Sequence, residues 1–167
     1  MPIEGIVQPE IIPVGDGLRL RKYDGTPDFA LAWYQDPDLV YQVDGVREPY
    51  TLEKLQRMYS YLDQHGELYW IEAEEDEAYR PIGDVTFSQE DMPIVIGEAA
   101  WRGCGVGRKV IAALVQRGFS LGYEQLHVGE IYDWNEASRR CFESVGFRQN
   151  AKTNKGASYV LKRKDLP

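Results

Sequence analysis

The sequence predicts a single α/β domain that spans residues 1–167 and is built around a mixed sheet. The length suits one compact domain with its own hydrophobic core. Hydrophobic residues make up 43% of the chain, which separates it from disordered proteins of low hydrophobicity. Short apolar runs alternate with longer segments of helical spacing, in the order strand, two helices, three strands, helix, strand, helix and two strands.

An N-terminal strand and a helix are predicted first. Residues 18–21 alternate apolar and basic side chains, which is the pattern of a half-buried strand. Thr26 followed by Pro27 is typical of a helix N-cap with proline at the first helical position. Because the next proline, Pro37, would interrupt a helix, we expect this helix to end before it.

A second helix and a hairpin should follow. Thr51 is a suitable N-cap for a longer helix with one apolar face, and Gly66 is placed to end it. The runs 68–73 and 82–87 have strand character, and the charged segment 74–77 between them is expected to turn. These two strands should therefore pair as a hairpin.

The second half of the chain alternates strands and helices. We expect a strand at 92–96, a helix at 107–120, a strand at 125–131 and a helix at 135–145. Gly146 follows the last helix in the position where glycine is favoured. A final hairpin is predicted from two short apolar runs, 147–149 and 158–161.

Charge and composition argue against several classes of function. The formal net charge of −8 disfavours nucleic acid and anionic membranes as partners, and it attracts cations. Two cysteines without CxxC spacing and two histidines predict neither a disulfide framework nor a metal site. The N-terminus does not resemble a signal peptide, and no apolar stretch approaches the roughly 20 residues that span a bilayer. We therefore expect a soluble, cytoplasmic protein.

The strongest functional signal is a glycine-rich loop, Arg102–Gly107, between a predicted strand and an amphipathic helix. Its three alternating glycines allow a tight bend and leave backbone N–H groups bare. Those groups, together with the positive end of the following helix, suit a pyrophosphate. Arg108 and Lys109 add positive charge. A plain glycine-rich turn before a helix is the alternative interpretation. A P-loop and a dinucleotide-binding loop are set aside, because the spacing of neither is present.

Two blocks of the sequence together resemble the GNAT family of N-acetyltransferases. The loop matches that family's [QR]-x-x-G-x-[GA] signature, with Arg102, Gly105 and Gly107 in the defined positions. In the family, the next strand leads to an asparagine and then to a helix followed by Gly-Phe. Here these are Asn135 and Gly146-Phe147. The rest of the chain is similar to the ribosomal-protein, polyamine and aminoglycoside acetyltransferase branches.

The resemblance, which covers residues 92–147, implies a mixed, mostly antiparallel central sheet flanked by about four helices. It also implies acetyl-CoA as the co-substrate. The strand before the loop would pair its backbone with the pantetheine arm, and the loop would hold the pyrophosphate. The cofactor-binding residues implied in this way are Ile94, Val95, Ile96, Arg102, Gly103, Cys104, Gly105, Val106, Gly107, Arg108, Asn135 and Phe142.

Two of these positions carry a second interpretation. Asn135 would contact the cofactor arm, cap its helix, or do both. Phe142 stands where many family members have a tyrosine that protonates the leaving thiolate, and a phenyl ring cannot donate a proton. We expect Phe142 to pack near the sulfur instead. A thiolate with a pKa near 8.5 is still a fair leaving group at neutral pH, so turnover is not excluded.

An amine acceptor must lose a proton before it attacks the thioester. For a lysine-like amine with a pKa of about 10.4, forming the free base at pH 7 costs roughly 4–5 kcal/mol. A carboxylate can take this proton. Glu130 is the first candidate, because it precedes Asn135 by five residues, as does the proposed base of ribosomal-protein alanine acetyltransferases. Glu98 is the second, and an ordinary solvent-facing glutamate is the alternative interpretation of Glu130.

The acceptor is predicted to be a cationic small molecule, with polyamines and aminoglycosides first. Residues 36–50 combine acidic and aromatic side chains, which suit a cation, so we expect this stretch to line the acceptor pocket. Acetylation of a protein N-terminus or lysine is one alternative. A non-catalytic acyl-CoA-binding sensor is another, because the tyrosine is missing. Many relatives form dimers, so a homodimer is an assembly open to this chain.

Overall fold

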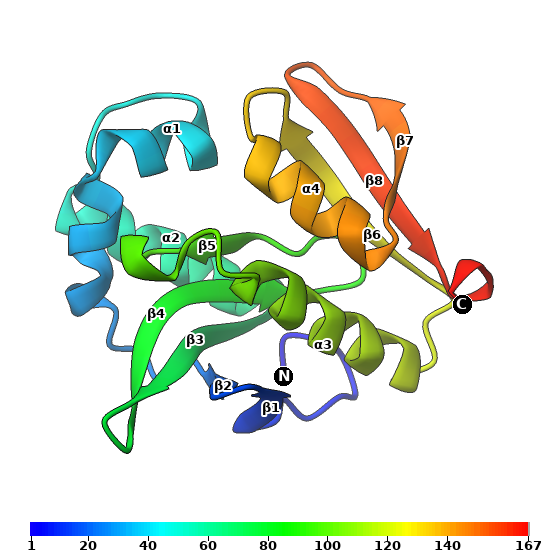
Figure 1. The fold of residues 1–167 in the computed structure, drawn as a ribbon, viewed down its shortest axis with the longest axis horizontal. Coiled ribbons are helices and arrows are strands. Elements are labelled where there is room, and N and C mark those ends of the chain that lie inside the picture. Colours follow the sequence, from blue (N-terminus) through cyan, green and yellow to red (C-terminus); the bar gives the residue numbers. More distant parts are fainter. Residues whose placement is uncertain (167) are drawn as a thin grey trace.

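Two antiparallel sheets form the framework of the computed structural model, which describes residues 1–166 (Figure 1). Their strand orders are β1-β2-β3-β4-β5 and β6-β8-β7, so the sheets part between β5 and β6. The first sheet contains β1 (Ile11–Gly15), β2 (Leu18–Lys22), β3 (Glu67–Glu75), β4 (Ala78–Phe87) and β5 (Ile94–Ile96). The second contains β6 (Gln125–Tyr132), β7 (Arg148–Lys152) and β8 (Gly156–Lys162).

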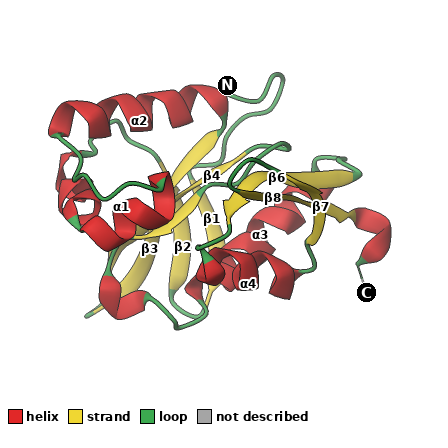
Figure 2. Ribbon diagram, turned by 90° about the horizontal axis from the view of Figure 1, so that it is seen from above, coloured by secondary structure: helices red, strands yellow, loops and turns green. Residues whose placement is uncertain are grey.

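Helices cover both sides of the first sheet. α1 (Pro37–Asp44) and α2 (Leu52–His65) lie on one side, and α3 (Val106–Ser120) and α4 (Glu136–Val145) lie on the other (Figure 2). One apolar cluster packs α1 and α2 against the first sheet, and a larger one joins α3 and α4 to both sheets. The predicted fold class is confirmed: an α/β domain with antiparallel strands and about four helices. The central sheet is divided into two.

Local sequence signals placed several elements correctly. The Thr51 hydroxyl accepts a hydrogen bond from the Lys54 N–H at 3.2 Å, so Thr51 caps α2 as predicted. The hairpin of β3 and β4 also forms, and its turn is confined to Asp76 and Glu77, both with positive φ. Within residues 1–166 there are also three 3-10 helices, at Asp28–Gln35, Ala99–Trp101 and Arg163–Asp165.

Other predictions near the N-terminus need correction. Thr26 caps no helix, because its N–H and its hydroxyl both donate to Asp24 Oδ1, at 3.1 and 2.7 Å. The helix that follows Pro27 is of the 3-10 type. α1 was not predicted, although Asp36 caps it by accepting from the Asp38 N–H at 2.9 Å. β1 was not predicted either. As an edge strand, it can accommodate Pro13.

A buried carboxylate, Asp84, lies on β4 beneath α2. It is 2% exposed, and no lysine or arginine pairs with it among residues 1–166. The hydroxyls of Tyr34 and Tyr59 donate to the same oxygen, Oδ2, at 2.8 and 2.7 Å. Burial nevertheless raises the pKa of Asp84 to about 6, because the two hydroxyl donors offset only part of the lost hydration.

We expect Asp84 to make the folded state less stable as the pH rises from about 4 to about 6. The pKa of this carboxyl is raised in the folded state, from 3.8 to about 6. Folding therefore favours the protonated form, and this advantage is lost as the carboxyl ionises. The effect amounts to about 3 kcal/mol. Urea unfolding at several pH values should show it in the wild type and not in Asp84→Asn. The same pH slope in both proteins would contradict the assignment.

Candidate active site

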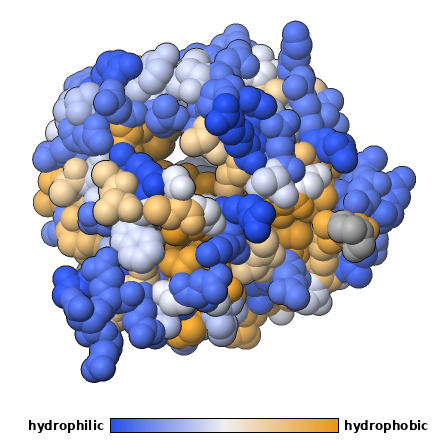
Figure 3. Space-filling view, viewed as in Figure 1, coloured by the Kyte–Doolittle hydropathy of each residue, from blue (hydrophilic) through white to orange (hydrophobic). Residues whose placement is uncertain are grey.

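A cavity of about 780 Å³ lies where the two sheets part. Its walls are α1, β5, the segment 101–108 without Cys104, and the stretch from Trp134 to Cys141 without Arg139. In Figure 3 a hollow with apolar sides opens on this face of the molecule, between the positions of α1 and α4 in Figure 1. The cavity therefore brings together the glycine loop, the short strand before it and the start of α4, which are far apart in sequence.

The glycine loop presents a row of unpaired backbone donors. Gly103 and Gly105 have φ values of +72° and +80°, and a Cβ on either would meet nothing within 4 Å. The first backbone hydrogen bond of α3 runs from the Lys109 N–H to the Gly105 oxygen, at 3.2 Å. Within the described chain, the N–H groups of residues 103–108 donate to no other backbone group. Such a row at a helix N-terminus suits a phosphate.

Basic side chains around the loop have different roles. Arg102 donates to the carbonyls of Ile96 and Gly97, at 2.9 and 3.0 Å, so it ties the loop to the end of β5. Lys109 pairs with Asp16 at 3.1 Å. Arg108 lines the cavity and has no ion-pair partner among residues 1–166. Arg108 is therefore the side chain best placed to add charge to the row of amides.

β5 offers a free edge to the cavity. The Pro93 carbonyl accepts from β4 at 3.0 Å, and the Gly97 N–H donates to β4 at 2.8 Å. In an antiparallel pair, bonded and non-bonded residues alternate, so the backbone groups of Ile94 and Ile96 point away from β4. The Ile96 carbonyl is occupied by Arg102. The N–H and the carbonyl of Ile94 and the N–H of Ile96 therefore remain available to an extended ligand.

The predicted acids lie outside the cavity lining. Glu130 is exposed, and its Oε2 accepts from the Thr153 hydroxyl at 2.5 Å and from the Lys155 N–H at 3.2 Å. The hydrogen bond from Thr153 is the main reason that the pKa of Glu130 is lowered. Glu98 lies two residues after the end of β5, and its Oε1 accepts from Trp33 Nε1 at 2.8 Å.

Three further predicted site residues differ in their placement. Asn135 lines the cavity, and it also caps α4 by accepting from the Ser138 N–H at 3.1 Å. Phe142 is 1% exposed and packs edge-on against Phe147 in the core, outside the lining. Cys104 is exposed and also outside the lining.

The acidic and aromatic stretch 36–50 divides between the core and the surface. Of its two aromatic residues, Tyr50 is buried in the core and Tyr41 is half-buried. Asp44 ends α1, where it accepts from the Tyr50 hydroxyl at 2.6 Å. Burial, together with the charges of Glu130 and Asp44, raises the pKa of Tyr132. Asp44 precedes Gly45, which closely approaches Trp134, and Tyr132 stacks on Trp134. Asp44 also pairs with Lys54 at 3.6 Å. We call Asp44, Glu130 and Tyr132, which lie outside the cavity lining, the acidic mouth.

Trp134 is a lining residue that the sequence analysis did not single out. Its ring stacks on Tyr132 of β6 and on Tyr41 of α1, with centroids 4.6 and 5.1 Å apart. Its position next to Asn135, a predicted cofactor-binding residue, could have indicated that Trp134 lies at the site. The Asp36-Pro37 pair, an N-cap followed by proline, was the signal for the helix that it contacts.

Within residues 1–166, no group of three or more potential metal ligands lies together. In the same part of the chain, no helix has both the length and the apolar character needed to cross a membrane.

The cavity offers a row of amides that suits a phosphate and a free strand edge that suits an extended ligand. Residues 18–148 match the family described as an acetyltransferase (GNAT) domain. The chain therefore belongs to the GNAT acetyltransferase family. A search of curated proteins gives no significant match.

Solved structures share the fold at low sequence identity. A GNAT-family acetyltransferase from Bacillus anthracis has a TM-score of 0.74 at 14% identity, covering 92% of this chain and 99% of its own. RimL, a ribosomal L7/L12 α-N-protein acetyltransferase in complex with coenzyme A, has a TM-score of 0.72 at 17% identity, covering 92% and 98%. AAC(6')-Ib with paromomycin and acetyl-CoA has a TM-score of 0.70 at 20% identity, covering 90% and 96%.

Proposed function

We propose that this protein transfers the acetyl group of acetyl-CoA to a primary amine of a cationic small molecule. Membership of an acetyltransferase family makes acetyl-CoA the co-substrate. The observation that carries the proposal is the layout of the cavity. Its lining includes the row of free amides and Arg108, and the acidic mouth with Asp44 lies beside Trp134, another lining residue.

The described residues fit the two parts of the co-substrate. The amides of residues 103–108 and the Arg108 guanidinium would hold the pyrophosphate, where charge-assisted hydrogen bonds are strong. The free backbone groups of Ile94 would pair with the amides of the pantetheine arm, and the Asn135 side chain would contact the same arm. Arg102 would act indirectly, because it fixes the loop to β5.

The transfer itself needs an oxyanion donor and a proton acceptor. The amine nitrogen bonds to the carbonyl carbon, the C–S bond breaks, and the sulfur leaves with the electron pair to be protonated as the thiol. The free Ile96 N–H would stabilise the oxyanion. Glu130 would take the amine proton through water with its second oxygen, Oε1, because Oε2 is already hydrogen-bonded. Glu98 is the second candidate for this role.

The acidic mouth supports a cationic acceptor. Asp44 and Glu130 would attract an ammonium group, and the net charge of −8 favours its approach from a distance. An aminoglycoside is bound in one structural neighbour, AAC(6')-Ib, and another, RimL, is described as a protein N-acetyltransferase. We place small cationic amines first because the mouth is acidic.

Thiol release from acetyl-CoA tests the proposal, with polyamines, aminoglycosides, amino acids and short peptides as acceptors. We expect the fastest release with a polyamine or an aminoglycoside. Release only with peptides would instead favour a protein acetyltransferase. If calorimetry shows that the protein binds acetyl-CoA but no acceptor causes thiol release, the result would favour a non-catalytic acyl-CoA-binding sensor.

Glu130→Gln should lower kcat about 100-fold, because it removes the proton acceptor. The affinity for acetyl-CoA should stay the same, since Glu130 is not part of the cavity lining. Thr153→Val is the matched control, because it removes the hydrogen bond to Glu130 and keeps the carboxylate. An equal loss in both variants would mean that Glu130 only holds the β7–β8 turn. Normal turnover of Glu130→Gln would exclude it as the base.

A further inference from the structure

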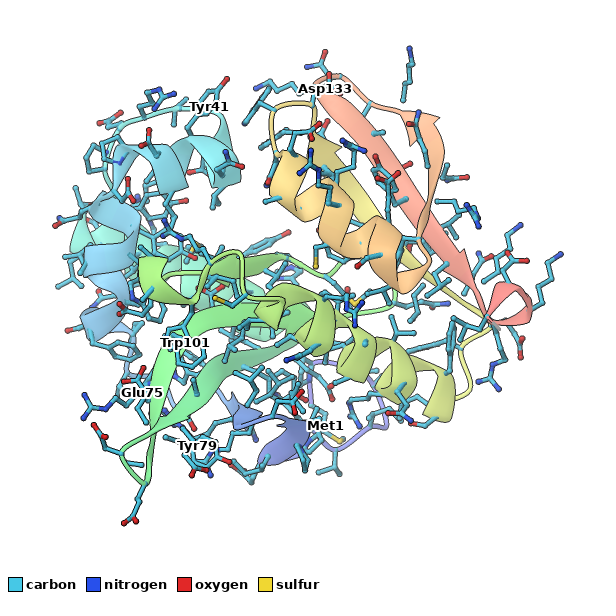
Figure 4. All side chains as sticks on the ribbon, in the orientation of Figure 1. Met1, Tyr41, Glu75, Tyr79, Trp101 and Asp133 are labelled. Atoms are coloured by element: carbon cyan, nitrogen blue, oxygen red, sulfur yellow. The ribbon has the colours of Figure 1, made fainter. Side chains whose placement is uncertain are left out.

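Trp134 connects two parts of the cavity wall that are 93 residues apart in sequence. Its Nε1 donates to the Tyr41 carbonyl of α1 at 2.9 Å. The ring stacks between Tyr41 and Tyr132, with interplanar angles of 26° and 19°. Figure 4 labels Tyr41 on α1 and Asp133, the residue before Trp134, on the loop between β6 and α4, opposite each other at the rim of the cleft.

The indole ring of Trp134 lies close to the backbone at the end of α1. Gly45, which ends α1, has a φ of +75°, and a Cβ at this position would lie 2.8 Å from Trp134 Cζ2. Glycine is therefore needed here both for the backbone conformation and for the close approach of the indole. The Arg47 guanidinium also lies 4.6 Å from the centroid of the Tyr41 ring.

α1 is attached at both ends to segments that bind the co-substrate under the proposed function. At its start, Asp36 lies 3.8 Å from an Arg102 nitrogen, and Arg102 fixes the glycine loop. At its end, Trp134 directly precedes Asn135, whose Nδ2 lies 3.5 Å from the Gln42 carbonyl. Between these attachments α1 lines the cavity, and it carries Asp44 of the acidic mouth.

We propose that Trp134 is a positioning residue that couples the acetyl-CoA site to the acceptor side of the cavity through α1. This inference rests on the proposed function. Co-substrate bound to the glycine loop and Asn135 holds both attachments in place. α1 is then held as well, and Asp44 is fixed at the acceptor end. Because coupling between two sites is reciprocal, an acceptor that orders α1 strengthens co-substrate binding by the same factor.

Hydrogen exchange with coenzyme A as the ligand tests the coupling without requiring the acceptor. In the wild type, saturating coenzyme A should slow exchange at residues 103–108, whose amides are otherwise unpaired. It should also slow exchange in α1 by about fivefold or more. In Trp134→Leu, slowing at 103–108 should persist, while slowing in α1 should fall below about twofold. Tyr41→Leu removes the same stack from the other side and should give the same result.

Trp101→Leu is the matched control. Trp101 lines the same cavity, but its Nε1 donates to Glu75 at 3.0 Å, toward the β3–β4 hairpin (Figure 4). Its removal should leave the coenzyme A effect on α1 in place. Trp134→Phe keeps a smaller aromatic ring and loses the Nε1 hydrogen bond, so it should be intermediate. This variant also provides a milder change if Trp134→Leu folds poorly.

The outcomes separate the two proposals. Slowing at 103–108 without slowing in α1 of the wild type would overturn the coupling and leave the proposed co-substrate site standing. If coenzyme A slows hydrogen exchange in α1 of both Trp134→Leu and Tyr41→Leu as much as in the wild type, the role of Trp134 is overturned. No slowing at 103–108 in the wild type would overturn the co-substrate site, and the coupling with it.

Discussion

Gly105→Val should weaken acetyl-CoA binding by about 100-fold or more, which corresponds to the loss of about two charge-assisted hydrogen bonds. Gly105 is the N-cap of α3 and has a φ of +80°. A β-branched residue is strongly disfavoured there, so the loop must change conformation. The amides of 103–108 would then no longer point to one place. Calorimetry with acetyl-CoA measures the effect directly.

Gly25 provides a matched control for this substitution. It also has a φ of +80°, a Cβ there would likewise meet nothing within 4 Å, and it lies outside the cavity lining. Gly25→Val should therefore lower stability by a similar amount through backbone strain, and leave acetyl-CoA affinity unchanged. Equal affinities of Gly105→Val and the wild type would exclude the loop as the pyrophosphate site.

The elements that the sequence predicted well depend on neighbouring residues. Thr51 caps α2 through a contact three residues away, and the β3–β4 hairpin follows from two strand-like runs around a short turn. The glycine loop is equally local, because its conformation depends on the glycines themselves. α1 has only eight residues, and a helix that short depends on tertiary packing, such as the contact of Trp134 with Tyr41.

The sequence could name the candidate site residues but not the directions of their side chains. Arg102 was expected on the pyrophosphate, yet its guanidinium binds carbonyls at the end of β5. Glu130 was predicted to be the base, and nothing in the sequence indicated that it accepts hydrogen bonds from residues 23 and 25 positions away. These contacts depend on how the β7–β8 hairpin and β5 are placed in space, and no local pattern encodes that.

Arg117→Leu should destabilise the fold by about 3–5 kcal/mol, the range observed when one partner of a buried ion pair is removed. Arg117 Nε and Nη2 donate to the two oxygens of Glu67, both at 2.7 Å, and Glu67 is 0% exposed. The Tyr69 hydroxyl donates to the same carboxylate at 3.0 Å. Leucine would leave a buried charge with only this neutral donor. Urea unfolding at pH 7 measures the loss.

The double variant Glu67→Leu/Arg117→Leu separates charge from packing. It removes the buried carboxylate together with its partner, so most of the stability should return. If the double variant is as unstable as Arg117→Leu, packing of the Arg117 stem is the cause, and the buried charge is not. Arg139→Leu is a surface control, because Arg139 pairs with Glu136 and Glu143 in exposed positions.

The ion pair also bears on the site, because it fixes α3 to β3, and the glycine loop precedes α3. If the pair only stabilises the fold, Arg117→Leu should bind acetyl-CoA normally at temperatures where it remains folded. If it also sets the position of α3, affinity should fall in the single variant and return in the double variant. Calorimetry on the folded variants would then show whether the row of amides depends on this distant contact.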